Sequence, residues 1–184
     1  MSRRLGTAVI LLALAASACS GQAGTSTQPA LLPPHERDDL AALFDPLVEP
    51  LGYRVTRASL IDRNTYQVDA EGGHLALYVA PLADISADQF AAAFPSLVAV
   101  FLPFVFDRWP ELHSFDVCQE PFNSTEGTPP SLTVIDLTRQ AATTVEWDKL
   151  DLAGLIDLNQ QQGITVWARP TVRDSATWSA AAGL

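Results

Sequence analysis

The sequence is poor in lysine and cysteine. Lys149 is the only lysine, and Cys19 and Cys118 are the only cysteines among 184 residues. Two cysteines cannot build the disulfide framework that holds many small secreted domains together. Basic residues are scarce as a class, because 11 lysines and arginines stand against 21 aspartates and glutamates. Such an acidic chain repels phosphate backbones, so we expect it not to bind nucleic acid.

The common catalytic motifs are also missing. The chain contains no Gly-x-Ser-x-Gly, no Ser-x-x-Lys, no phosphate-binding loop and no Gly-x-Gly-x-x-Gly. The histidines His35, His74 and His113 lie far apart in sequence, and none forms a close pair with a second ligand type. We therefore predict no metal site and no cofactor, and we interpret His74 and His113 as residues at strand edges.

Residues 1–18 have the pattern of a secretory signal peptide. Arg3 and Arg4 are followed by an apolar run from Leu5 to Ala16 and by small residues. A bilayer span needs about 20 apolar residues, so this run is too short to be one. Removing Arg3 and Arg4 with the signal leaves nine basic residues against 21 acidic ones, a balance of −12.

The segment that ends the signal, Ala15-Ala16-Ser17-Ala18-Cys19-Ser20-Gly21, resembles the lipobox of bacterial lipoproteins. The resemblance implies that Cys19 carries a thioether-linked diacylglycerol and further fatty acid such as palmitate, which anchors the chain at the extracytoplasmic face of the cell membrane. Ala16 departs from the pattern, because lipoproteins usually have Leu, Ile or Val there. The same residues also form an ordinary Ala-x-Ala cleavage site, which would release a soluble protein. The low lysine and high alanine content is typical of a high-GC bacterium.

Residues 19–34 after the cleavage site are rich in Gly, Ser, Thr, Gln and Pro, which is typical of a flexible tether. The remaining residues, 35–184, are predicted to form a single domain, because about 150 residues suffice for a hydrophobic core. Ser86 and Gln89 have the spacing of a capping box and predict a helix from Ala87 to about Trp109. An apolar stripe from Leu40 to Leu51 predicts an earlier helix that Pro46 breaks or kinks.

Several runs of alternating or apolar residues read as strands, and the short turns between the first three predict antiparallel hairpins. Leu75, Leu77 and Val79 alternate with more polar residues, so one face of that strand should meet the core. Strands and helices do not alternate regularly, which favours an α+β domain. We predict an antiparallel sheet of five or six strands packed with two to three helices, with strands at 53–61, 65–70, 74–80, 114–119, 132–137 and 164–169, and a further helical stretch at 141–158.

The apolar run from Leu97 to Phe106 has two interpretations. It is hydrophobic on all sides, which is typical of a buried central helix kinked near Pro95 and Pro103. Alternatively, part of it lines a groove for a lipid or a partner.

Cys118 is the one cysteine left in the domain, and it also has two interpretations. It could be a thiolate nucleophile with His113 or His74 as its base. Asp116 and Glu120 are anionic neighbours that disfavour a thiolate, so a small buried strand residue is the simpler interpretation. An unpaired thiol in an oxidising compartment could also form an intermolecular disulfide.

The carboxylates give weaker signals. Asp84 and Asp88 flank the start of the predicted 87–109 helix, where the helix dipole explains them. Glu146-Trp147-Asp148 places two carboxylates beside an aromatic ring, as sugar-binding sites do.

These observations favour a non-enzymatic, membrane-anchored envelope lipoprotein. The expected partners are the membrane, reached through the lipid anchor, and an envelope protein, a peptide or a small apolar ligand bound by the domain. Two alternatives stay open: a thiol-dependent envelope enzyme that uses Cys118, and a lipid carrier built around residues 97–106.

Overall fold

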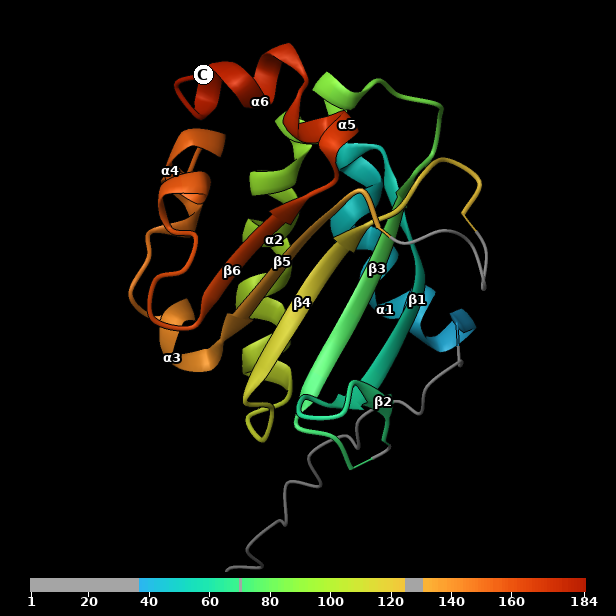
Figure 1. The fold of residues 1–184 in the computed structure, drawn as a ribbon. Coiled ribbons are helices and arrows are strands. Elements are labelled where there is room, and N and C mark those ends of the chain that lie inside the picture. The colour runs from blue at the N-terminus through green and yellow to red at the C-terminus, as the bar shows by residue number, and fades with distance from the viewer. Residues whose placement is uncertain (1–36, 70, 125–130) are drawn as a thin grey trace, which may run out of the picture.

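A computed structural model describes residues 37–69, 71–124 and 131–184. The predicted signal peptide, the tether, His35 and the lipidation site Cys19 lie outside the described residues. The domain that follows contains one open sheet with helices packed against it (Figure 1).

The sheet has six strands in the order β2-β1-β3-β4-β5-β6. All neighbouring strands are antiparallel except β3 and β4, which are parallel. A long helix connects β3 to β4, and such a crossover lets the two strands run in the same direction. The strands are β1 (Tyr53–Asp62), β2 (Gln67–Val68), β3 (His74–Pro81), β4 (Ser114–Gln119), β5 (Thr133–Thr138) and β6 (Ile164–Ala168).

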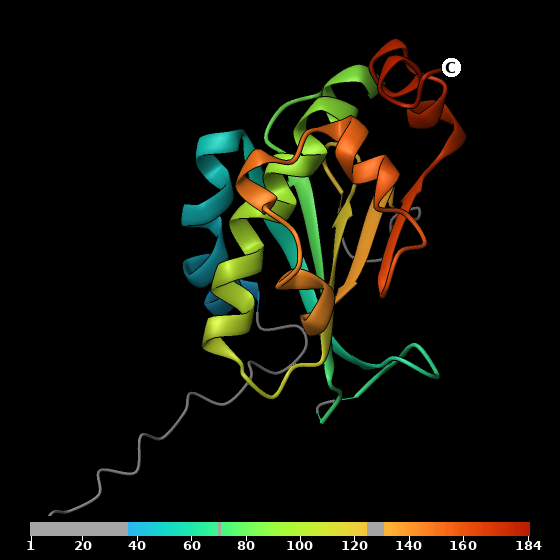
Figure 2. The ribbon, with the colours of Figure 1, turned by 90° about the vertical axis from the view of Figure 1, so that its left-hand side faces the viewer.

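The helices leave one face of the sheet open. Figure 2 shows the long helices and the orange helical segment after β5 on one side of the sheet, and the red helices α5 and α6 beyond its upper end, while no helix of the described residues covers the other side below them, toward which the β1–β2 hairpin projects. We call this second side the helix-free face. The helices are α1 (Arg37–Val48), α2 (Ala87–Arg108), α3 (Arg139–Ala142), α4 (Leu152–Asp157), α5 (Pro170–Arg173) and α6 (Ala176–Ala181), with 3-10 turns at Glu49–Leu51 and Trp147–Lys149.

The predicted α+β class, the single domain and the six-strand sheet are confirmed. The sheet is mostly antiparallel, as expected, and the β3–β4 pair is its parallel exception. More helices are present than the two or three predicted, because the helical stretch predicted at 141–158 is divided into α3, a 3-10 turn and α4, and because α5 and α6 were not anticipated. The predicted strand at 65–70 is reduced to Gln67–Val68, because Asp62 Oδ1 accepts hydrogen bonds from the N–H groups of residues 64 and 65 and turns the chain there.

Helix α2 forms the centre of the core. Ser86 and Gln89 make the predicted capping box, and the helix continues for 22 residues past two internal prolines. By length and composition alone α2 could cross a membrane. In this fold, however, Leu97, Val98 and Phe101 have no exposed surface and pack against the sheet and the other helices. Phe101 also makes an edge-to-face contact with Phe44 of α1, with 5.8 Å between ring centroids.

Candidate functional site

Strand alternation sorts the side chains of the sheet into two sets. Alternate residues of β3 and β4 join the core, namely Leu75, Leu77, Val79, Phe115 and Val117. The intervening residues point to the helix-free face, as the alternation in β3 predicted. They include His74, Ala76 and Tyr78 on β3 and Ser114, Asp116 and Cys118 on β4, so most of the chemistry-bearing side chains of the sheet gather on this face.

A hydrogen-bonded chain of three side chains lies at the lower end of the helix-free face. His74 Nδ1 is 2.8 Å from Ser114 Oγ, and His74 Nε2 is 3.3 Å from Asp116 Oδ2. The parallel register of β3 and β4 produces this arrangement, because it pairs His74 with Ser114 and places Asp116 two residues farther along the neighbouring strand. His74 is the first residue of β3 and is only 2% exposed. It lies on a central strand between β1 and β4.

An ion pair crosses the sheet beside this chain. Asp136 on β5 lies directly opposite Asp116, and Arg63 Nη2 is 3.1 Å and 3.0 Å from the two oxygens of Asp136. Arg63 belongs to the turn after β1, so its side chain spans β3 and β4 to reach β5. Burial raises the pKa of Asp136, and the charge of Asp116 raises it further, while Arg63 and His74 act in the opposite direction.

Cys118 lies on the same face, and its contacts are with acidic and hydroxyl groups. Its Sγ is 3.6 Å from Asp116 Oδ1, and burial, followed by the charge of Asp116, raises the thiol pKa well above its usual value. The strand register pairs Cys118 with Tyr78, four residues from the position of His74. At about 3.3 Å per residue this separates Cys118 from His74 by roughly 13 Å along the sheet, and from His113 by roughly 16 Å. The geometry therefore supplies neither histidine as a base for the thiol.

A second cluster lies higher on the face, around the β-bulge at Thr56. The guanidinium of Arg57 stacks 3.6 Å from the ring centroid of Tyr78. Glu120 accepts a hydrogen bond of 2.7 Å from Thr56 Oγ1 and forms an ion pair of 3.4 Å with Arg57. Burial raises the pKa of Tyr78 to about 12, so its hydroxyl stays protonated at physiological pH. This cluster joins β1, β3 and the end of β4 through side chains.

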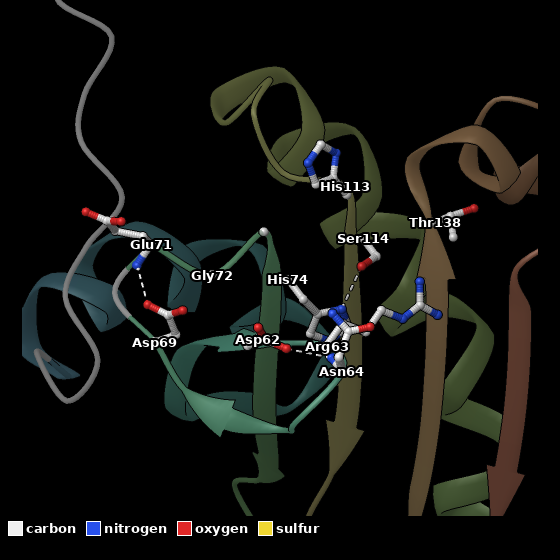
Figure 3. Close-up of a pocket in the computed structure, with 11 residues that line it drawn as sticks. Asp62, Arg63, Asn64, Asp69, Glu71, Gly72, His74, His113, Ser114 and Thr138 are labelled. Carbon is white, nitrogen blue, oxygen red and sulfur yellow. Dashed lines mark hydrogen bonds between the residues drawn. The ribbon is translucent and has the colours of Figure 1, made fainter.

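A pocket of about 320 Å³ opens at the lower end of the sheet, beside the Ser114–His74 hydrogen bond (Figure 3). One wall is the turn after β1, and the opposite wall is formed by the starts of β3 and β4 and the end of β5. Its size is at the lower end of the range for small-ligand sites. The residues that line it are polar apart from two glycines, namely Asp62, Arg63, Asn64, Asp69, Glu71, Gly72, Gly73, His74, His113, Ser114 and Thr138.

An apolar groove of about 480 Å³ runs along the outer side of α2. Leu47, Val100, Pro103 and Phe104 line it, with Asp107 and Arg108 at one end. The two interpretations of the 97–106 run therefore apply to different sides of the same helix. The side that carries Leu97 and Phe101 is buried core, and the side that carries Val100 and Phe104 borders the open groove.

The other sequence candidates have structural explanations. Asp88 accepts a hydrogen bond of 2.6 Å from the backbone N–H of Thr177, which lowers the pKa of Asp88 and ties α2 to α6. Trp147 is buried and donates from Nε1 to the Ala142 carbonyl, so its ring offers no platform for a sugar. Within the described ranges no group of three or more His, Cys, Asp or Glu side chains has the arrangement of a metal site.

Sequence reasoning missed the Ser114–His74–Asp116 chain and the Arg63–Asp136 pair. These residues are 40 and 73 positions apart in sequence and meet only because β3 pairs with β4 and the Arg63 side chain crosses two strands. Alternation in β3 predicted the face of each of its residues, but the partner strands could not be read from it. No protein-family model matches this sequence, and neither a curated protein nor a solved structure is detectably similar to it.

Proposed function

We propose that this chain is a lipoprotein of the bacterial cell envelope, anchored through acylated Cys19, and that its domain is a non-enzymatic binding module. The signal-like residues 1–18, the lipobox-like segment and the acidic charge support the location. The helix-free face supports the binding role, because it combines a polar pocket with exposed aromatic and charged groups that the fold itself leaves uncovered.

The order of exposure along the Ser114–His74–Asp116 chain argues against a hydrolase. Ser114 and His74 are 1% and 2% exposed, while the Asp116 side chain is 17% exposed. A catalytic serine must reach substrate, yet here the carboxylate is the member nearest to solvent. In serine hydrolases the ring nitrogen Nε2 faces the nucleophile and Nδ1 faces the carboxylate, and His74 has the opposite arrangement. The three hydrogen-bonded side chains therefore act as a rigid polar support for the surface around them.

The single observation that carries the binding role is a row of side chains across five strands. Register pairs Arg57 with Tyr78, Tyr78 with Cys118, Cys118 with Val134, and Val134 with Trp167. Trp167, at the end of this row, is 45% exposed, whereas Trp109, Trp147 and Trp178 are buried. Exposed tryptophan and partly buried arginine are enriched where proteins bind partners.

Photo-crosslinking in intact cells tests this role. A photoreactive amino acid at Thr165, which is exposed beside Trp167, should give a discrete crosslinked product. The same group at Ser96, an exposed residue of α2 on the opposite side of the sheet, serves as the matched control. Equal yields from both positions, or no product from Thr165, would show that the helix-free face is not the binding surface.

The anchor has a separate test. Mass spectrometry of the purified protein should find a diacylglycerol and an amide-linked acyl chain on residue 19, and Cys19→Ser should shift the protein from the membrane fraction or block its processing. An unmodified mature N-terminus recovered without detergent would favour plain secretion.

The apolar groove along α2 supports a second candidate role, the binding of a small apolar ligand. Leu47, Val100 and Phe104 border an open space of a size that holds part of an acyl chain. Native mass spectrometry should then detect a co-purifying lipid that Val100→Asp removes. This role would be excluded if protein purified from cell membranes contains no bound lipid.

A further inference from the structure

The tip of the β1–β2 hairpin, residues 62–69, is weakly attached to the rest of the sheet, whereas β1 itself pairs with β3 from Tyr53 to Ile61. Strand β2 has two residues, both exposed, and among the described strands it pairs with β1 alone, through Ile61 with Val68 and Asp62 with Gln67. Tyr66, at the turn, adopts the left-handed conformation with φ of 56°, which a tyrosine adopts at some cost in energy. Figure 2 shows the hairpin leaving the plane of the sheet on the helix-free side.

This hairpin forms one wall of the polar pocket. Asp62, Arg63 and Asn64 line the pocket from the hairpin, while His74 and Ser114 line it from the body of the sheet. Figure 3 shows the Arg63 side chain extending from the hairpin past His74 and Ser114 in the direction of β5. The width of the pocket therefore depends on where the hairpin lies.

In the part of the chain that the structure describes, one ion pair holds this wall in place. The backbone hydrogen bonds of the hairpin are local, as from Tyr66 N to the Asp62 carbonyl and from Asp69 N to the Leu60 carbonyl. For residues 63–69, the contacts found in the described part of the chain include one link beyond β1, from Arg63 to Asp136 on β5. Within the described residues, the other hydrogen bonds of this segment return to residues 60–72.

We propose that the tip of the β1–β2 hairpin, residues 62–69, is a lid over the polar pocket and that the Arg63–Asp136 ion pair is the latch that holds it closed. The Arg63–Asp136 ion pair is weak because it is partly exposed to solvent. The Arg63 side chain is 39% exposed and reaches Asp136 through a single nitrogen, so water and salt compete with the contact. The closed lid shields the Ser114–His74 hydrogen bond, and the open lid widens the pocket toward solvent.

The Arg63–Asp136 ion pair also neutralises one member of a partly buried pair of carboxylates. Asp136 faces Asp116 across the β4–β5 pair, with His74 on β3 beside them and Arg63 above. When Arg63 leaves, Asp136 loses its counter-charge next to a second acid. A ligand with a cationic group can then take the place of the guanidinium, which gives the opened pocket a preference for cations over anions.

Hydrogen exchange measured by mass spectrometry tests the latch on the free protein, so its outcome does not depend on the proposed binding role. Arg63→Ala and Asp136→Asn should each speed exchange in a peptide covering residues 60–69 by about two- to fivefold, the range expected for a partly exposed ion pair. Peptides from β4 and β5 should be unchanged. Arg173→Ala, which removes the exposed pair with Asp174, is the matched control and should have no effect on residues 60–69.

The double variant Arg63→Ala/Asp136→Asn separates a latch from two independent effects. If the residues act only through each other, exchange in the double variant equals that of either single variant. Raising the salt concentration should also speed exchange of residues 60–69 in the unmodified protein, because the pair is partly exposed. The proposal would be overturned if the effects of the two substitutions add in the double variant or if exchange rises equally in all peptides. It would also be overturned if exchange of residues 60–69 responds neither to the substitutions nor to salt.

Discussion

Replacing His74 by alanine should destabilise the domain strongly, although the residue lies on the face of the sheet opposite the hydrophobic core. The substitution removes the partner of Ser114 Oγ, which lies 2.8 Å from Nδ1 in a residue only 1% exposed. A buried polar group without a partner costs about 1–3 kcal/mol. Asp116, 3.3 Å from Nε2, is partly exposed and can rehydrate, so its contribution is smaller. The cavity left by the imidazole adds about 1 kcal/mol or more.

We therefore expect His74→Ala to lower the free energy of unfolding by about 2–4 kcal/mol. Urea unfolding followed by tryptophan fluorescence measures it, because Trp109, Trp147 and Trp178 are buried. The slope of the transition should stay unchanged. His113→Ala is the matched control: His113 is exposed, so its loss should cost less than about 1 kcal/mol. Equal losses for the two variants, or a His74→Ala loss below about 0.5 kcal/mol, would refute the assigned role of the buried chain.

Three further outcomes follow from the described contacts. Because burial raises the pKa of Cys118, iodoacetamide should label the folded protein far more slowly than the urea-unfolded protein at pH 8, and equal rates would show an accessible thiol. Phe101→Ala should cost about 3–5 kcal/mol in urea unfolding, against less than about 0.5 kcal/mol for the exposed Ser96→Ala. Because the pKa of Asp136 is raised on folding, its ionised form costs stability at neutral pH, and this cost disappears as pH falls through the folded pKa. Asp136→Asn should thus keep or raise the free energy of unfolding at pH 7, because Arg63 is partly exposed and can be hydrated. A decrease in the free energy of unfolding of more than about 2 kcal/mol at pH 7 that is absent at low pH would contradict this.

Much of the fold follows from local sequence patterns. The capping box at Ser86 and Gln89 marks the start of α2 because the cap is made by residues three positions apart. The alternation in β3 gives the correct core face because the strand period is set by the backbone. The C-terminal helices were missed, although Ser175 caps α6 and Pro170 opens α5, because the segment is short and its apolar spacing is weak.

The candidate site was predictable only in part. Cys118 and His74 were recognised as chemically interesting, yet their partners depend on strand order and register. The parallel β3–β4 pairing puts His74 next to Ser114 instead of Cys118, and no local pattern encodes that register. Arg63 was part of a predicted turn, and its reach across two strands to Asp136 depends on a long side chain that sequence spacing does not describe.

Oxidative footprinting of Trp167 tests the central claim, that the helix-free face is covered by a partner in the envelope. Trp167 is the exposed tryptophan of the described residues, and Leu184, 87% exposed near the C-terminus, provides the internal reference. Relative to Leu184, hydroxyl radicals should oxidise Trp167 more slowly in intact cells than in the purified protein. Equal relative rates in cells and in solution would show an uncovered face and contradict the account.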